Sequence, residues 1–115
     1  MSHMIIPGES VETVRIPWAS LTTLGVLEDP TASTVEIGFS ADREVEPTIW
    51  NAAAWETSEE IRLPVGGTIV ETPYKATILI GSGATDLAEG LHAMWVRVTD
   101  SPEVPIRFVS FVEVT

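Results

Sequence analysis

The chain has 115 residues, which suits one domain and leaves little room for a second. Its 17 acidic and 6 basic residues give a formal net charge of −11, which disfavours nucleic acid as a partner because such binding depends on Lys and Arg. The sequence contains no cysteine, which excludes disulfides and thiolate metal sites, and no apolar run approaches the roughly 18 residues of a membrane span.

The first residues set the expected start of the domain, and the hydrophobic content indicates whether it is expected to associate. Met1-Ser2-His3-Met4 is typical of an expression-tag remnant followed by a native start, so we expect residues 1–4 to be tag and residues 5–115 to be a single domain. His3 is therefore excluded as a functional histidine. No basic and apolar leader follows Met4, so we expect no standard secretory export. Hydrophobic residues make up 44% of the chain and the mean hydropathy is +0.22, which favours an oligomer or a docked state that covers apolar surface.

Apolar and polar residues alternate with a period of two over most of the chain, the pattern of half-buried β-strands. The only stretches that could form helical turns, Ala52–Glu60 and Asp86–Glu89, are too short for the crossover helices of an α/β fold. We therefore predict an all-β, antiparallel β-sandwich of about seven strands. In chain order, the expected strands are Val11–Trp18, Thr34–Ser40, Thr48–Trp50, Ile61–Val65, Lys75–Ile80, Leu91–Thr99 and Ile106–Val114.

One of these strands indicates that the sandwich is immunoglobulin-like. The run Gly90–Val96 fits the Gly-x-Tyr-x-apolar-x-Val pattern of strand F in such domains, with Met94 at the position of the antibody cysteine. His92 occupies the tyrosine position on the expected core face, so we expect it to pack or to cap the corner before the strand. The strands Val11–Trp18 and Ile106–Val114 are the expected edges at which a neighbouring subunit could pair.

The sequence offers few candidates for a catalytic, cofactor or metal site. Gly81-Ser82-Gly83 is expected to be a turn, because position 86 is aspartate and the third glycine of a dinucleotide loop is missing. Asp42, Glu44 and Glu46 could share one side of an extended segment and hold Ca²⁺, but the usual calcium loop is absent and a solvated acidic loop is favoured. We therefore predict a protein that is not an enzyme, with no catalytic residue, cofactor or metal.

Two of the four tryptophans, Trp50 and Trp55, lie in or near the predicted loops and form the candidate interaction surface. In one interpretation they are exposed and provide a hot spot for a protein partner or a stacking platform for a sugar. In the other they cap the end of the sandwich. A carbohydrate-binding or adhesion module that uses these tryptophans is thus the alternative to a protein-assembly role.

A family resemblance begins at about Trp50 and covers the C-terminal two-thirds of the chain. It is carried by the spacing Trp50-x4-Trp55, by the strand Tyr74–Ile80 with its glycine turn, and above all by the segment Met94–Arg107. These features resemble small proteins encoded among the virion structural genes of actinobacterial tailed phages and prophages. A typical member has an aromatic residue where His92 stands.

The resemblance implies a non-enzymatic structural or assembly protein of a tailed bacteriophage particle, either capsid-associated, head-to-tail or tail-associated. Its expected partners are other phage structural proteins, with a homo-oligomer as a further expectation and neither nucleic acid nor membrane. The expected location is the virion, after synthesis in the cytoplasm of the bacterial host. No catalytic residue is carried over from the family.

Overall fold

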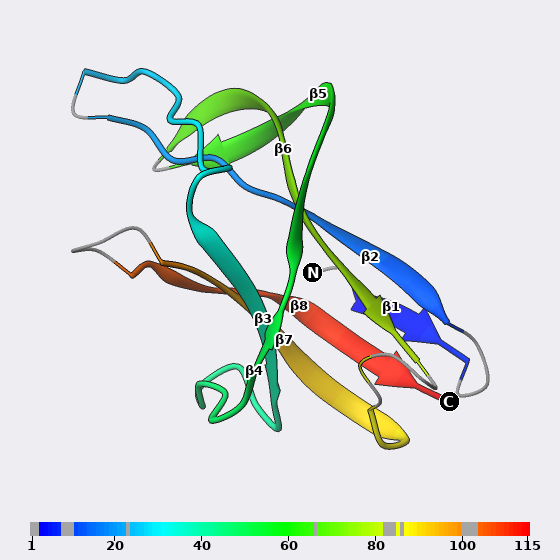
Figure 1. The fold of residues 1–115 in the computed structure, drawn as a ribbon. Helices are drawn as coiled ribbons and strands as arrows, with labels where there is room; N and C mark the ends of the chain where they lie inside the picture. The colour runs from blue at the N-terminus through cyan, green and yellow to red at the C-terminus, as the bar shows by residue number, and fades with distance from the viewer. Residues whose placement is uncertain are drawn as a thin grey trace.

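The computed structural model describes residues 3–7, 11–22, 24–65, 67–81, 85, 87–99 and 104–115, and within these ranges it is all-β (Figure 1). Two sheets form the fold, which confirms the expected all-β, two-sheet architecture. None of the described residues belongs to a helix long and apolar enough to cross a membrane. The five-stranded sheet has the order β1 (His3–Ile6), β8 (Ile106–Val114), β7 (Gly90–Thr99), β3 (Thr34–Ser40) and β4 (Trp50–Ala52). The three-stranded sheet has the order β2 (Glu12–Pro17), β6 (Thr68–Ile80) and β5 (Ala54–Val65).

The structure has eight strands within the described residues, where about seven were expected. β4 is at Trp50–Ala52 rather than Thr48–Trp50, and β6 begins at Thr68, before the expected Lys75. β1 starts at His3, inside the segment assigned to a tag, and pairs in parallel with β8, so the sandwich is not wholly antiparallel. β8 is consequently an interior strand rather than the expected edge, whereas β2 is an edge strand as expected. The stretch Ala52–Glu60, which could have formed helical turns, lies mostly in strands: Ala52 ends β4, and residues 54–60 begin β5. Residues 54–57 pair through the backbone with β6.

The core lies between the two sheets and follows the predicted alternation on most strands. Met94 of β7 is almost fully buried and belongs to the core. Each fully buried aliphatic side chain contributes about 1.5–3 kcal/mol relative to its exposed state. The core comprises Ile6, Val14, Ile16, Trp18, Val35, Ile37, Ala76, Ile78, Ile80, Met94, Val96, Val98 and Val112.

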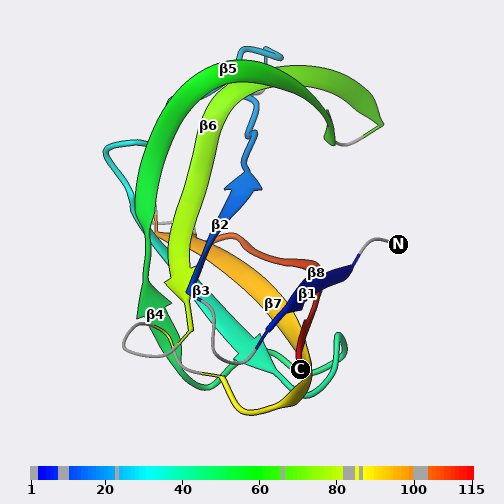
Figure 2. The same ribbon diagram turned by 90° about the vertical axis from the view of Figure 1, so that its right-hand side faces the viewer.

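The hairpin of β5 and β6 extends past the sandwich as a curved arm. Its register shifts between Thr57 and Ile61, and β-bulges of this kind bend a strand pair. The part beyond this shift, Ile61–Thr72, is called the arm below; in Figure 2 it arches over one end of the molecule. The arm is fastened to the end of β2, because the buried Thr72 hydroxyl donates a 2.6 Å hydrogen bond to the carbonyl oxygen of Trp18.

Candidate functional site

The outer face of the three-stranded sheet is polar. Arg15 donates a hydrogen bond of 2.9 Å to Glu56, and the Lys75 ammonium group donates to Ser58. Thr77 of β6 lies directly opposite Arg15, and Thr13 lies two residues before Arg15 on the same face of β2. This is the usual arrangement of an antiparallel sheet, in which one face packs on the core and the other is hydrated.

The outer face of the five-stranded sheet is different, because it carries aromatic residues. Trp95 and Phe108 make an edge-to-face contact with ring centroids 5.7 Å apart, and Phe108 and Phe111 make another at 5.3 Å. Such pairs contribute about 0.5–1.5 kcal/mol each beyond the area that they bury. We call this surface the aromatic face; it comprises Trp50, Trp95, Phe108 and Phe111, with the exposed Ile5 and Leu91 beside them.

A bulge brings Phe108 and Phe111 to the same face. Strict alternation predicts that Phe108 faces the core with Val112, while Val109 and Phe111 face outward. The register of β7 and β8 shifts between Met94 and Trp95, so Phe108 turns outward and Val109 packs against the core instead. The predicted orientation of the first half of β8 was therefore wrong, because one extra residue reverses every side chain before it.

The loop between β3 and β4, residues 41–49, covers part of the aromatic face. Its Arg43 guanidinium lies 5.2 Å from the centre of the Phe108 ring, and Pro47 lies directly over Gly38. The Ser40 hydroxyl accepts a 3.0 Å hydrogen bond from the Trp95 indole and donates one of 2.8 Å to the carbonyl oxygen of Asp42. Trp95 is consequently only 9% exposed although it points away from the core.

The acidic residues of this loop remain hydrated. Asp42, Glu44 and Glu46 are all exposed, and the Asp42 carboxylate accepts a 3.1 Å hydrogen bond from the backbone N–H of Glu44. In the part of the chain that the structure describes, no three His, Cys, Asp or Glu side chains lie close enough to hold a metal ion. The loop is therefore a solvent-exposed acidic segment.

The two candidate tryptophans are in different sheets and have different surroundings. Trp50 of β4 belongs to the aromatic face, where the guanidinium of Arg97 lies 4.4 Å from its ring centre and pairs with Glu36 at 2.8 Å. Trp55 of β5 packs against the core, and its indole donates a 2.8 Å hydrogen bond to the carbonyl oxygen of Ser33. The structure does not bring the two rings together as one stacking platform.

His92 is the third residue of β7, and its ring reaches back to the corner that precedes the strand. Its Nε2 atom is 2.7 Å from the carbonyl oxygen of Ala88, which fits an imidazole N–H that donates to the backbone of this corner. This is the contact that a corner-capping role requires. In the expected glycine turn, Ser82, Gly83 and Asp86 lie outside the described residues.

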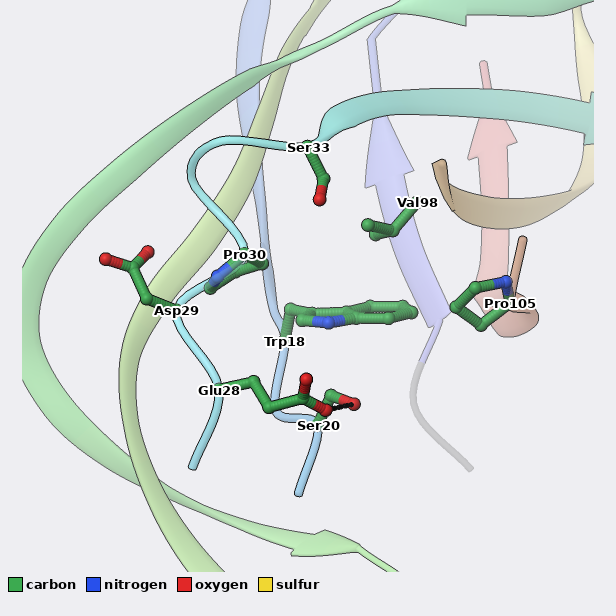
Figure 3. Close-up of a pocket in the computed structure, with 8 residues that line it drawn as sticks. All are labelled: Trp18, Ser20, Glu28, Asp29, Pro30, Ser33, Val98 and Pro105. Carbon is green, nitrogen blue, oxygen red and sulfur yellow. Dashed lines mark hydrogen bonds between the residues drawn. The ribbon is translucent and has the colours of Figure 1, made fainter. Parts of the chain in front are cut away.

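A small polar pocket of about 70 Å³ lies beside the indole of Trp18 (Figure 3). The Ser20 hydroxyl donates a 3.0 Å hydrogen bond to the Glu28 carboxylate, while the Asp29 carboxylate points away from the indole. Hydrogen bonds from the side chain and the backbone of Thr31 lower the pKa of Asp29. The pocket has room for about two water molecules, so it suits local hydration better than a substrate.

The aromatic face is thus an unusual surface among the described residues, and the sequence pointed to it only through Trp50. The aromatic pattern in β8 was masked by the bulge, and the exposed Leu91 gave no signal of its own. Comparison of the chain with protein-family models, with curated proteins and with solved structures finds no match.

Proposed function

We propose that the chain is an immunoglobulin-like domain that acts as a non-enzymatic structural or assembly protein of a tailed bacteriophage particle, through contacts with other proteins. The strand order supports the immunoglobulin-like part of this proposal. The neighbours β8, β7 and β3 correspond to strands G, F and C of such domains, with β4 as an added edge strand, and β2, β6 and β5 correspond to B, E and D. The hydrogen bond of His92 at the corner before β7 agrees with this correspondence.

The aromatic face carries the functional proposal. An antiparallel sheet whose outer face is in contact with water usually carries polar side chains on that face. In this chain both faces of the five-stranded sheet are largely apolar. Aromatic residues and arginine are enriched at the centres of protein interfaces, and this face combines both in the stacked pair of Trp50 and Arg97. A protein partner that covers the exposed Ile5 and Leu91 would remove this apolar surface from water.

The distribution of charge supports contact through the same face. The two charged residues at its centre, Glu36 and Arg97, neutralise each other, and Glu113 of β8 lies on the same face between Ile5 and Leu91. The described exposed acids lie mostly in loops and on the β5–β6 hairpin. A partner that meets the aromatic face therefore avoids most of the repulsion from a chain of net charge −11. The exposed acids in question are Glu28, Asp29, Asp42, Glu44, Glu46, Glu59, Glu60, Glu71 and Glu89, and Glu12 is a further exposed acid at the start of β2.

The assignment to a phage particle, and to the virion as location, rests on the resemblance of Met94–Arg107 to virion structural proteins. A particle presents many copies of one contact, so a modest affinity of each aromatic face is multiplied by avidity. Partners of this kind include other structural proteins of the same phage and further copies of the chain.

The test compares two leucines of matched exposure on opposite outer faces. Leu91, on the aromatic face, is 54% exposed, and Leu79, on the polar face of the three-stranded sheet, is 51% exposed. We expect Leu91→Lys to weaken self-association in light scattering, or capture of co-expressed virion proteins, while Leu79→Lys leaves both unchanged. A wild-type protein that is monomeric at every concentration and captures no virion protein contradicts the proposal, as do equal effects of the two variants.

A further inference from the structure

A second surface lies between the arm and the body of the sandwich. A groove of about 270 Å³ separates Leu63 and Pro64 of the arm from Val96 and Val109 of the five-stranded sheet. It is also lined by Trp18 and by Phe108, which belongs to the aromatic face as well. This volume is just below the lower end of ordinary ligand pockets, so the groove suits a few side chains of a polypeptide rather than a large cofactor. We call it the arm groove.

Arg107 is the charged residue that lines the arm groove. Its guanidinium lies 4.0 Å from the ring centre of Trp18 and donates a 3.0 Å hydrogen bond to the carbonyl oxygen of Ala19. Burial lowers the pKa of Arg107 through desolvation, but a guanidinium stays charged at neutral pH. Among the described residues no carboxylate pairs with it, whereas Arg15 and Arg97 each pair with a glutamate. The guanidinium N–H groups of Arg107 that face the groove can therefore donate hydrogen bonds to a carboxylate of a partner, and this chain itself carries 17 acidic residues.

A segment of complementary chemistry is exposed elsewhere on the same chain. In the loop of residues 41–49, Val45 is 54% exposed and is flanked by the exposed Glu44 and Glu46. The single ion pair of this segment among the described residues joins Arg43 and Glu44 across 3.9 Å, and both side chains are solvated. The loop and the arm lie toward opposite ends of the molecule (Figure 1), although Arg43 of the loop lies 5.2 Å from the ring centre of Phe108, which also lines the groove. The loop of one copy can therefore approach the arm groove of the next.

We propose that the arm groove binds the Glu44-Val45-Glu46 segment of a second copy of this chain. A glutamate of the incoming loop pairs with Arg107, and Val45 enters the apolar part of the groove between Leu63 and Val109. Because the two surfaces differ, the contact is head-to-tail and generates a ring or an open row of copies. The inference rests on the proposal that the chain acts through protein contacts, but it uses a surface separate from the exposed leucine of the aromatic face.

Charge-reversal variants of the full chain test this contact by sedimentation velocity over a range of concentrations. We expect Arg107→Glu alone, and the pair Glu44→Lys with Glu46→Lys alone, each to weaken self-association at least about tenfold. An equimolar mixture of the two proteins is expected to recover association, because each copy then offers its neighbour an oppositely charged surface. High salt is expected to weaken the wild-type contact as well.

Matched variants keep the test independent of folding and of net charge. Arg62→Glu changes the charge of the arm outside the groove, and Glu59→Lys with Glu60→Lys changes two exposed acids of β5, so both are expected to associate like the wild type. The loop variants lie on exposed residues and are expected to keep the wild-type circular dichroism spectrum even if Arg107→Glu perturbs Trp18.

The outcomes separate this inference from the proposed function. The head-to-tail contact is overturned if the single-protein variants associate normally, or if their mixture fails to recover association. Loss of association in Leu91→Lys together with normal association in the charge variants leaves the aromatic face as the interface and removes the arm groove. Binding of a virion protein, rather than a second copy, that depends on Arg107 also overturns it.

Discussion

The hydroxyl of Thr72 is the point at which the arm is joined to the sandwich, and its removal is the sharpest test of the fold. Thr72 is 0% exposed, and its Oγ1 atom donates to the Trp18 carbonyl at 2.6 Å and accepts from the Tyr74 N–H at 3.2 Å. Thr72→Val keeps the shape of the side chain but removes both hydrogen bonds. A buried polar group that is left unsatisfied costs about 1–3 kcal/mol, so we expect the free energy of unfolding to fall by about 2 kcal/mol.

This loss converts into a measurable change in the midpoint of thermal unfolding. With an unfolding entropy of about 2.1 cal/mol/K per residue, a loss of about 2 kcal/mol lowers Tm by about 8 °C in a chain of 115 residues. Urea and thermal unfolding followed by tryptophan fluorescence give both quantities. A fall in the urea midpoint without a change in slope would show that stability, and not the compactness of the unfolded state, has changed.

Two variants control for packing and for strand propensity. Thr72→Ser keeps the hydroxyl and loses one methyl group, so we expect a loss of about 1 kcal/mol. Thr77→Val changes the same residue type in the same strand, where the hydroxyl makes a longer, exposed hydrogen bond of 3.3 Å to Ala54, and we expect a change below about 0.5 kcal/mol. If Thr72→Val is no more destabilising than Thr77→Val, the idea that this hydroxyl fastens the arm is wrong.

Three further predictions concern the loop over the aromatic face, the candidate tryptophans and acid stability. Gly38→Ala should cost about 1–3 kcal/mol of unfolding free energy, because the new Cβ would lie 2.7 Å from Pro47; a double-mutant cycle with Pro47→Gly should show coupling, and its absence would refute the clash. Trp55→Phe should lower stability by about 1–2 kcal/mol in urea unfolding through loss of the indole hydrogen bond, and an unchanged midpoint would contradict it. The lowered pKa of Asp29 means that its hydrogen bonds with Thr31 stabilise the fold above the unfolded pKa of about 4 and are lost as pH falls through the folded pKa. Asp29→Asn should therefore show a weaker fall in stability at acid pH than the wild type, and parallel titration curves would count against this role.

Strands with one buried face were predicted correctly from the alternation of apolar and polar residues. Strands whose position depends on backbone pairing, or which are very short, were not predicted. In β3 the alternation of Val35 and Ile37 with Glu36 holds because one side packs on the core and the other does not. The second half of β5 was predicted as the strand Ile61–Val65, whereas its first half was missed because the run from Glu56 to Glu60 is polar. Residues 54–57 of that half are ordered by backbone pairing with β6. β1 has four residues, which are too few for a periodic signal.

The candidate site was predicted in part for related reasons. Trp50 does lie on the aromatic face, but Trp55 turns to the core because its neighbour across the strands is the buried Ala76. Phe108 could not be placed from sequence, since a single bulged residue in β8 exchanges its face with that of Val109. Arg107 could not be singled out from the sequence either, because its guanidinium stacks on Trp18, which is far away in the chain.

The free edge of β5 has a consequence for how copies of this chain avoid unwanted growth. An edge strand of 12 residues would ordinarily invite another chain to add to the sheet, which is the route to amyloid. Here Glu59 and Glu60 lie at the register shift of β5, and Arg62 and Pro64 follow in the same strand. Backbone pairing along this edge is discouraged by the charged side chains, by the bend at the register shift and by Pro64, which has no N–H. The chain can then reach high local concentrations without its sheets fusing into fibrils.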